Sequence, residues 1–145
     1  MRSLVGSLLY ACLTRPDIAY SVNKLDQFMH KPCEQHLVAV KSVLRYLNGT
    51  LDYGLAFFPS LENLQLIAFA DVYWGGSVDE KRSISGSCVY LSGNLVIWGS
   101  RKQKIVSQST TKAEYRSLAD VASDTTWLEE LLSDMRVTME AVPVI

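Results

Sequence analysis

The sequence lacks long apolar runs. The uninterrupted apolar stretches of its 145 residues are only a few residues long, far short of the ~20 needed to span a bilayer. Arg2 is not followed by the apolar region and small-residue cleavage site of a secretory signal. There are three cysteines and no Cys-x-x-Cys pair, which argues against a disulfide framework and against a redox or thiolate metal site. These absences predict an intracellular protein that is neither secreted nor inserted in a membrane.

Acidic residues are missing from one long stretch of the chain. Residues 81–113 contain six basic residues and no acidic one, whereas residues 114–140 contain seven acidic residues and two basic ones. The net charge is −1, so only this distribution is informative. Lysine and arginine beside serine and glutamine suit contacts to nucleic-acid phosphates, and a solvated hairpin face is the alternative. The candidate nucleic-acid-binding residues are Lys81, Arg82, Arg101, Lys102, Gln103 and Lys104.

The first third of the chain has the apolar spacing of helices. One helix is expected to stop near Thr14, and Pro16 suits the first turn of a second helix. A third helix is expected from about Glu34 to Asn48-Gly49, a pair that favours a helix stop.

The apolar period then changes to two, which is typical of strands. Strands are expected at residues 53–57 and 64–70. Residues 84–91 and 95–98 predict a hairpin around a short Ser-Gly-Asn loop, and residues 103–108 could extend its second strand.

A long helix is predicted from about Thr111 to Met135, and residues 142–145 resemble the beginning of another strand. The order of these elements predicts an α/β fold with a helical N-terminal part. The expected apolar face of the long helix consists of Leu118, Val121, Ala122, Leu128, Leu131, Leu132 and Met135.

Two acidic residues stand out by their positions. Asp71 follows the strand at residues 64–70, whose apolar residues on both faces predict a central strand. A carboxylate there suits a site at the end of a sheet, and a turn cap is the alternative. Glu114 belongs to a Thr111-x-x-Glu114 capping-box pattern, but its spacing to Leu118 also directs it towards the sheet. If both carboxylates point inwards, they could hold a divalent cation.

His30, Cys33 and His36 recur at intervals of three residues, which superficially suggests a metal site. The set lacks a fourth ligand and is interrupted by Pro32. It therefore does not favour zinc.

An ordered series of motifs resembles one known family. The segment at residues 2–10, followed by residues 14–20 and 43–47, closely resembles the end of the reverse transcriptase of copia-type LTR retrotransposons. The later motifs are similar to the ribonuclease H domain that follows the polymerase in the same Pol polyprotein. These motifs are Ala70-Asp71, Trp74, Arg82–Gly86, Trp98, Lys102-Gln103, Ser109–Tyr115 and Leu118. The resemblance covers essentially the whole chain.

The resemblance implies a domain order and an activity. Residues 1–52 would be the helical C-terminal part of the reverse transcriptase. Residues 53–145 would be the N-terminal part of a ribonuclease H-like α/β domain, with a mixed sheet and a long helix. The implied activity is cleavage of the RNA strand of an RNA–DNA hybrid with Mg²⁺ ions held by four carboxylates. Asp71 matches the family's first-strand aspartate and Glu114 its helix glutamate, and the remainder of the Pol polyprotein is an implied partner.

The chain departs from the family pattern at the site. Val72-Tyr73 stands where the family usually has Ala-Asp, and Lys112 stands where it has Glu. The family's two further aspartates would lie on the strand that begins at Val142 or later, and the Asp-Asp pair of a polymerase is absent. We therefore expect a truncated, diverged Pol fragment that is catalytically inactive as this chain. A non-catalytic nucleic-acid-binding module that uses the basic hairpin and a protein-interaction fragment are the alternatives.

Overall fold

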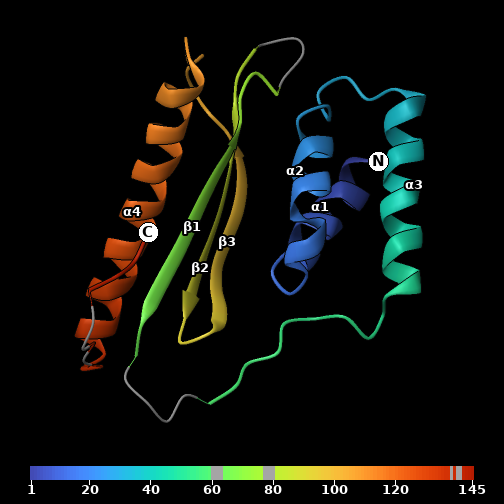
Figure 1. Ribbon diagram of the computed structural model, residues 1–145. Helices are drawn as coiled ribbons and strands as arrows, with labels where there is room; N and C mark the ends of the chain where they lie inside the picture. Colours follow the sequence, from blue (N-terminus) through green and yellow to red (C-terminus); the bar gives the residue numbers. More distant parts are fainter. Residues whose placement is uncertain (60–63, 77–80, 138, 140–141) are drawn as a thin grey trace. The chain divides into compact units, whose positions relative to one another are not determined.

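The computed structural model describes residues 1–59, 64–76, 81–137, 139 and 142–145. The chain divides into two compact units, Met1–Leu55 and Ala56–Ile145. Figure 1 shows that the first unit is built from helices and that the second combines a sheet with one long helix. The fold is therefore mixed α/β.

The first unit contains three α-helices and a short 3₁₀ helix. These are α1 (Arg2–Ala11), η1 (Pro16–Ile18), α2 (Ala19–Asp26) and α3 (Glu34–Gly49). The helical prediction is confirmed, including the role of Pro16 as the first residue of a helical turn. A single cluster of apolar side chains holds the helices together: Val5, Leu8, Ile18, Val22, Leu25, Met29, Val40 and Val43.

The second unit contains a sheet with the order β1-β2-β3. Its strands are β1 (Leu66–Tyr73), β2 (Ile84–Leu91) and β3 (Asn94–Lys102), and both pairings are antiparallel. The predicted hairpin is confirmed, with Gly93 at a φ of 82° in its turn. Near the C-terminus, Val144 forms one isolated parallel bridge with Ile67. Apart from this bridge, β1 is at the edge of the described sheet, so the expected central position of this strand is not confirmed.

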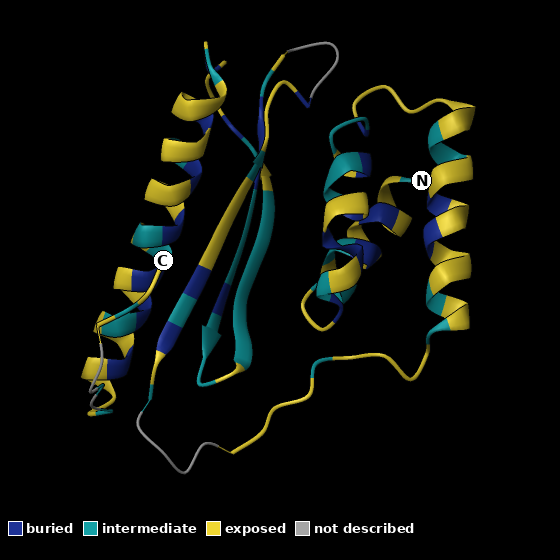
Figure 2. Ribbon diagram, in the orientation of Figure 1, coloured by how far each residue is buried: buried dark blue, intermediate teal, exposed yellow. Residues whose placement is uncertain are grey.

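The long helix α4 (Thr110–Asp134) packs against one face of this sheet. Leu66, Ala68 and Val89 of the sheet are buried against Val121 and the C-terminal half of the helix. In Figure 2 the buried stripe of α4 faces the strands. The stripe consists of Ala113, Ser117, Val121, Thr125, Leu128 and Leu132.

Two sequence-based expectations about these elements are wrong, and a third is right only in part. Residues 53–57 form no strand, and Phe57 and Phe58 are exposed in an extended segment. Residues 103–108 do not continue the hairpin, because β3 ends at Lys102. The expected apolar face of α4 is right only in part. Val121, Leu128 and Leu132 are buried as expected, whereas the other large members Leu118, Leu131 and Met135 are exposed. The small polar residues Ser117 and Thr125 are buried as well. Serine and threonine can be buried on this face of the helix because their hydroxyls can hydrogen-bond to backbone carbonyls.

Candidate functional site

A pocket of about 430 Å³ lies where β1 meets the N-terminal half of α4. Its lining includes both predicted carboxylates, Asp71 from the strand and Glu114 from the helix. Thr111, Tyr115 and Leu118 also border it from the helix. The fold thus brings to one pocket two acidic residues that are 43 positions apart in the sequence.

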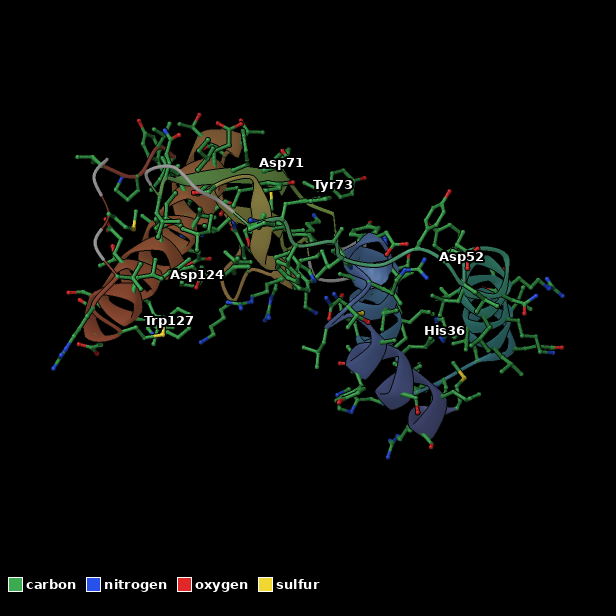
Figure 3. All side chains as sticks on the ribbon, turned by 90° about the horizontal axis from the view of Figure 1, so that it is seen from below. His36, Asp52, Asp71, Tyr73, Asp124 and Trp127 are labelled. Carbon is green, nitrogen blue, oxygen red and sulfur yellow. The ribbon has the colours of Figure 1, made fainter. Side chains whose placement is uncertain are left out.

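Asp71 is held on the strand rather than after it. It lies inside β1, paired with Gly86 of β2, and Figure 3 shows it beside Tyr73 on the same strand. Asp71 is exposed, and it lines the pocket together with its neighbours Ala70 and Val72 on the strand. Its Oδ1 accepts a hydrogen bond of 2.8 Å from the backbone N–H of the next residue. The alternative of a turn cap after the strand is therefore wrong.

A direct contact joins the strand to the helix at this point. The hydroxyl of Ser117, 1% exposed, donates a hydrogen bond of 3.0 Å to the backbone carbonyl of Asp71. Ser117 lies one turn after Glu114 in α4. This hydrogen bond fixes the position of α4 along β1. The sequence did not indicate Ser117, because a single serine within a helix belongs to no recognisable motif.

Glu114 has no capping role. The residue that caps α4 is Ser109, whose side chain accepts from the backbone N–H of Lys112 at 3.3 Å. The expected Thr111-x-x-Glu114 capping box is therefore wrong, because the helix begins one residue earlier than predicted and Thr111 already lies inside it. Glu114 is exposed and borders the pocket.

The donor chemistry of the pocket suits a hard divalent cation. Mg²⁺ prefers oxygen ligands and is commonly held by one or two carboxylates together with water and phosphate oxygens. Asp71 and Glu114 supply two such carboxylates on rigid elements. Within the described part of the chain, no three histidine, cysteine or acidic residues gather into a possible metal cluster. Asp71 and Glu114 are therefore the carboxylates that this pocket could offer to a cation.

Gln103 is paired inside the protein, although it contributes to the lining of a second groove on this side of the molecule. Gln103 is 7% exposed, and its side-chain amide donates to Ser85 Oγ at 3.0 Å and to the Ala113 carbonyl at 2.9 Å. Its Oε1 accepts from Ser107 Oγ at 3.1 Å. A side chain whose polar atoms are paired inside the protein cannot contact a phosphate. Its assignment to nucleic-acid binding therefore finds no support in its position.

The remaining basic residues lie near the end of β3 and before β2. Arg101 and Lys104 are exposed, Lys81 is exposed, and Arg82 and Lys102 are partly buried. A second groove of about 470 Å³ is lined by a basic segment and by the facing side of α4. Its charged lining residues are Arg101, Lys102, Lys104, Arg116, Asp120 and Asp124. The acidic block of the sequence thus faces the basic block, and Figure 3 places Asp124 on α4.

The histidine and cysteine set of the helical unit forms a local helix start. Cys33 precedes α3, its backbone N–H donates to His36 Nδ1 at 3.1 Å, and its Sγ lies 3.3 Å from the same nitrogen. The His36 ring stacks on Phe28 with ring centroids 4.5 Å apart. Among the described residues, His30 is not grouped with these two side chains in a cluster that could hold a metal.

Comparisons with known proteins find relatives that are similar over most of this chain. It is 46% identical over 144 residues to the retrovirus-related Pol polyprotein from transposon RE1 of Arabidopsis thaliana and 44% identical over 144 residues to the one from transposon RE2. Each alignment covers 99% of this chain and 10% of the relative. The secreted RxLR effector protein 161 of Plasmopara viticola is 41% identical over 127 residues, which cover 87% of this chain and 89% of that protein. No protein-family profile and no solved structure matches the chain.

The chain is similar over nearly its whole length to a segment of retrovirus-related Pol polyproteins from transposons. It spans about a tenth of the length of the two Arabidopsis polyproteins that it matches. None of the helices in the described part of the chain combines the length and the apolar character that a bilayer span requires.

Proposed function

We propose that this segment contributes a magnesium-binding half-site to a ribonuclease H-like domain that acts on RNA–DNA hybrids. In this proposal residues 1–52 are the helical end of the reverse transcriptase, and the sheet unit is the first part of the ribonuclease H-like domain. The observation that supports it best is that Asp71 and Glu114, two residues that match the family's carboxylates, border one pocket.

The chemistry follows from what the two side chains can do. Asp71 on β1 and Glu114 on α4 would each offer carboxylate oxygens to Mg²⁺ from elements that packing holds in place. A magnesium ion bound there would neutralise charge on a phosphate oxygen and help to activate water. Lys112 carries a positive charge on the same helix as Glu114. Its Nζ donates to Gln108 Oε1 at 3.1 Å, so the ammonium group is held beside a residue that precedes the helix start.

The 145-residue chain by itself is expected to bind the cation without efficient cleavage. Two metals held a few ångströms apart need a larger set of carboxylates than the two at this pocket. Removal of ligands that act as a unit costs most of the rate, because their contributions are not additive.

The alternative of a non-catalytic nucleic-acid-binding module has less support. Of its six candidate residues, Gln103 is buried. Arg101, Lys102 and Lys104 line a groove whose other wall carries Asp120 and Asp124. Carboxylates on the facing wall repel phosphates and so weaken non-specific electrostatic binding.

The proposal is tested by magnesium titration of the 145-residue chain, followed by NMR, and by a hybrid-cleavage assay on the same samples. Asp71→Asn and Glu114→Gln should each weaken magnesium binding by about tenfold or more, since each removes a direct ligand and even outer-shell changes cost roughly 10–100-fold. Asp120→Asn is the matched control, because it neutralises an exposed acid on the same helix that lines the other groove.

Two results would contradict the proposal. One is equal loss of magnesium affinity in Asp120→Asn, which would indicate diffuse attraction to the acidic helix. The other is a wild-type chain in which magnesium shifts no resonance of Asp71 or Glu114. Efficient cleavage that both pocket substitutions abolish would support the site and overturn the expectation that this chain is inactive.

A further inference from the structure

We propose that Gln103 is a positioning residue of the carboxylate pocket, which holds the first turn of α4 where Glu114 borders the same pocket as Asp71. The part of this inference that concerns magnesium rests on the proposed function. The part that concerns the helix stands on the hydrogen bonds of Gln103 alone.

The side-chain amide of Gln103 forms three hydrogen bonds to other parts of the protein. Its Nε2 donates to Ser85 on β2 and to Ala113 on α4, and its Oε1 accepts from Ser107 on the connecting segment. Its own backbone N–H donates to the Ser83 carbonyl at 2.8 Å. A buried amide with this many partners has one permitted orientation, because any other leaves buried polar atoms unpaired.

The contact to Ala113 acts directly on the helix that carries the pocket glutamate. Ala113 is fully buried and immediately precedes Glu114. Its carbonyl accepts from Gln103 Nε2 at 2.9 Å. Helical carbonyls point along the helix axis, but their oxygens lie off that axis. A hydrogen bond from outside the helix to the Ala113 oxygen therefore restrains rotation of this turn and, with it, the position of residue 114.

The network continues to the strand that carries the pocket aspartate. The hydroxyl of Ser107 accepts from Arg116 Nη1 at 2.7 Å, and its backbone carbonyl accepts from the Trp74 indole N–H at 3.1 Å. Trp74 lies in the turn that follows β1, three residues after Asp71. A connected chain of hydrogen bonds therefore runs from the end of β1 through Ser107 and Gln103 to the first turn of α4.

This chain supplements the direct bond from Ser117 to the Asp71 carbonyl. Ser117 holds the strand against the second turn of the helix, and Gln103 holds the first turn against β2 and the connecting segment. Metal ligands must be kept within about 0.5 Å of their working geometry by packing and by further hydrogen bonds. The two contacts together provide that support for Asp71 and Glu114.

The test compares Gln103→Met with wild type in the full 145-residue chain. Methionine keeps much of the buried volume and removes all three side-chain hydrogen bonds, and Gln103→Ala serves as a second variant. Leu132→Ala is the matched control, because Leu132 is buried at the opposite end of α4. Three quantities are measured by NMR: amide exchange at residues 113–117, the resonance of the Trp74 indole N–H with the exposed Trp127 as reference, and magnesium affinity.

In Gln103→Met we expect faster exchange at residues 113–117, a shifted Trp74 resonance and a loss of about tenfold in magnesium affinity, as for other residues that orient metal ligands. Leu132→Ala should lower the melting temperature without these three changes. Unchanged exchange and an unchanged Trp74 resonance in both Gln103 variants would overturn the inference, as would an equal loss of magnesium affinity in Leu132→Ala. If the exchange and the Trp74 resonance respond but wild type binds no magnesium, Gln103 still positions the helix and the proposed function is wrong.

Discussion

At the scale of single residues, the strongest electrostatic arrangement lies in the helical unit. Arg15, 8% exposed, donates to Asp17 Oδ2 at 2.7 Å and to the carbonyl and hydroxyl of Thr50 at 2.9 and 2.8 Å. Tyr46 donates to the same Asp17 oxygen at 2.8 Å. These contacts tie the segment before α2 to the end of α3.

This arrangement gives a pH dependence. The hydrogen bond from Arg15 is the main cause that lowers the pKa of Asp17 from 3.8 to about 2, and Tyr46 adds to it. Because the pKa is lower in the folded state, the stabilisation is present above about pH 4 and is lost as the pH falls through about 2. Asp17→Asn should make the helical unit less stable at pH 7 and reduce its loss of stability between pH 4 and pH 2. Circular dichroism with denaturant at each pH measures this.

Asp26→Asn, which changes an exposed acid at the end of α2, is the control for that measurement. It should retain the acid dependence of wild type. An Asp17→Asn variant with the wild-type dependence would mean that other acids determine the acid sensitivity of the unit.

At the scale of elements, the residue that caps the start of α4 is Ser109 in the structure, whereas the sequence pattern indicated Thr111. Ser109→Ala should destabilise the sheet unit by about 1 kcal/mol, because it removes the side chain that accepts from the Lys112 N–H. Thr111→Ala should have little effect, since Thr111 is exposed and lies inside the helix. Thermal unfolding of both variants is the measurement. The reverse order of effects would restore the capping box that the sequence pattern suggested.

The same element explains why the site could be predicted only in part. Asp71 and Glu114 were identifiable because a carboxylate beside a buried strand and a glutamate in the first turn of a helix are both recognisable from local sequence. Ser117, Ser107 and Gln103 were not, because a hydroxyl or amide reveals its role only through the atoms that it meets. Gln103 was instead grouped with its basic neighbours, whose side chains lie at the surface or are partly buried.

At the scale of the whole molecule, the chain has two hydrophobic cores with no residue in common. Leu25→Ala in the helical core and Leu66→Ala in the sheet core should each cost about 2–5 kcal/mol. Hydrogen exchange should locate each loss mainly in its own unit, because each truncated side chain belongs to the core of that unit. An equal loss of protection in both units from either substitution would show that the two cores unfold as one.

The sequence by itself determined the elements whose signals are local. Apolar spacing and proline defined the helices of the first unit, and alternation with a Ser-Gly-Asn turn defined the hairpin, because these patterns reflect backbone geometry over a few residues. Only the tertiary structure decided that residues 53–57 remain outside the sheet, that Val144 pairs with β1, and that Gln103 is buried. Those outcomes depend on contacts between segments far apart in the chain, and such contacts leave no period or motif in the sequence.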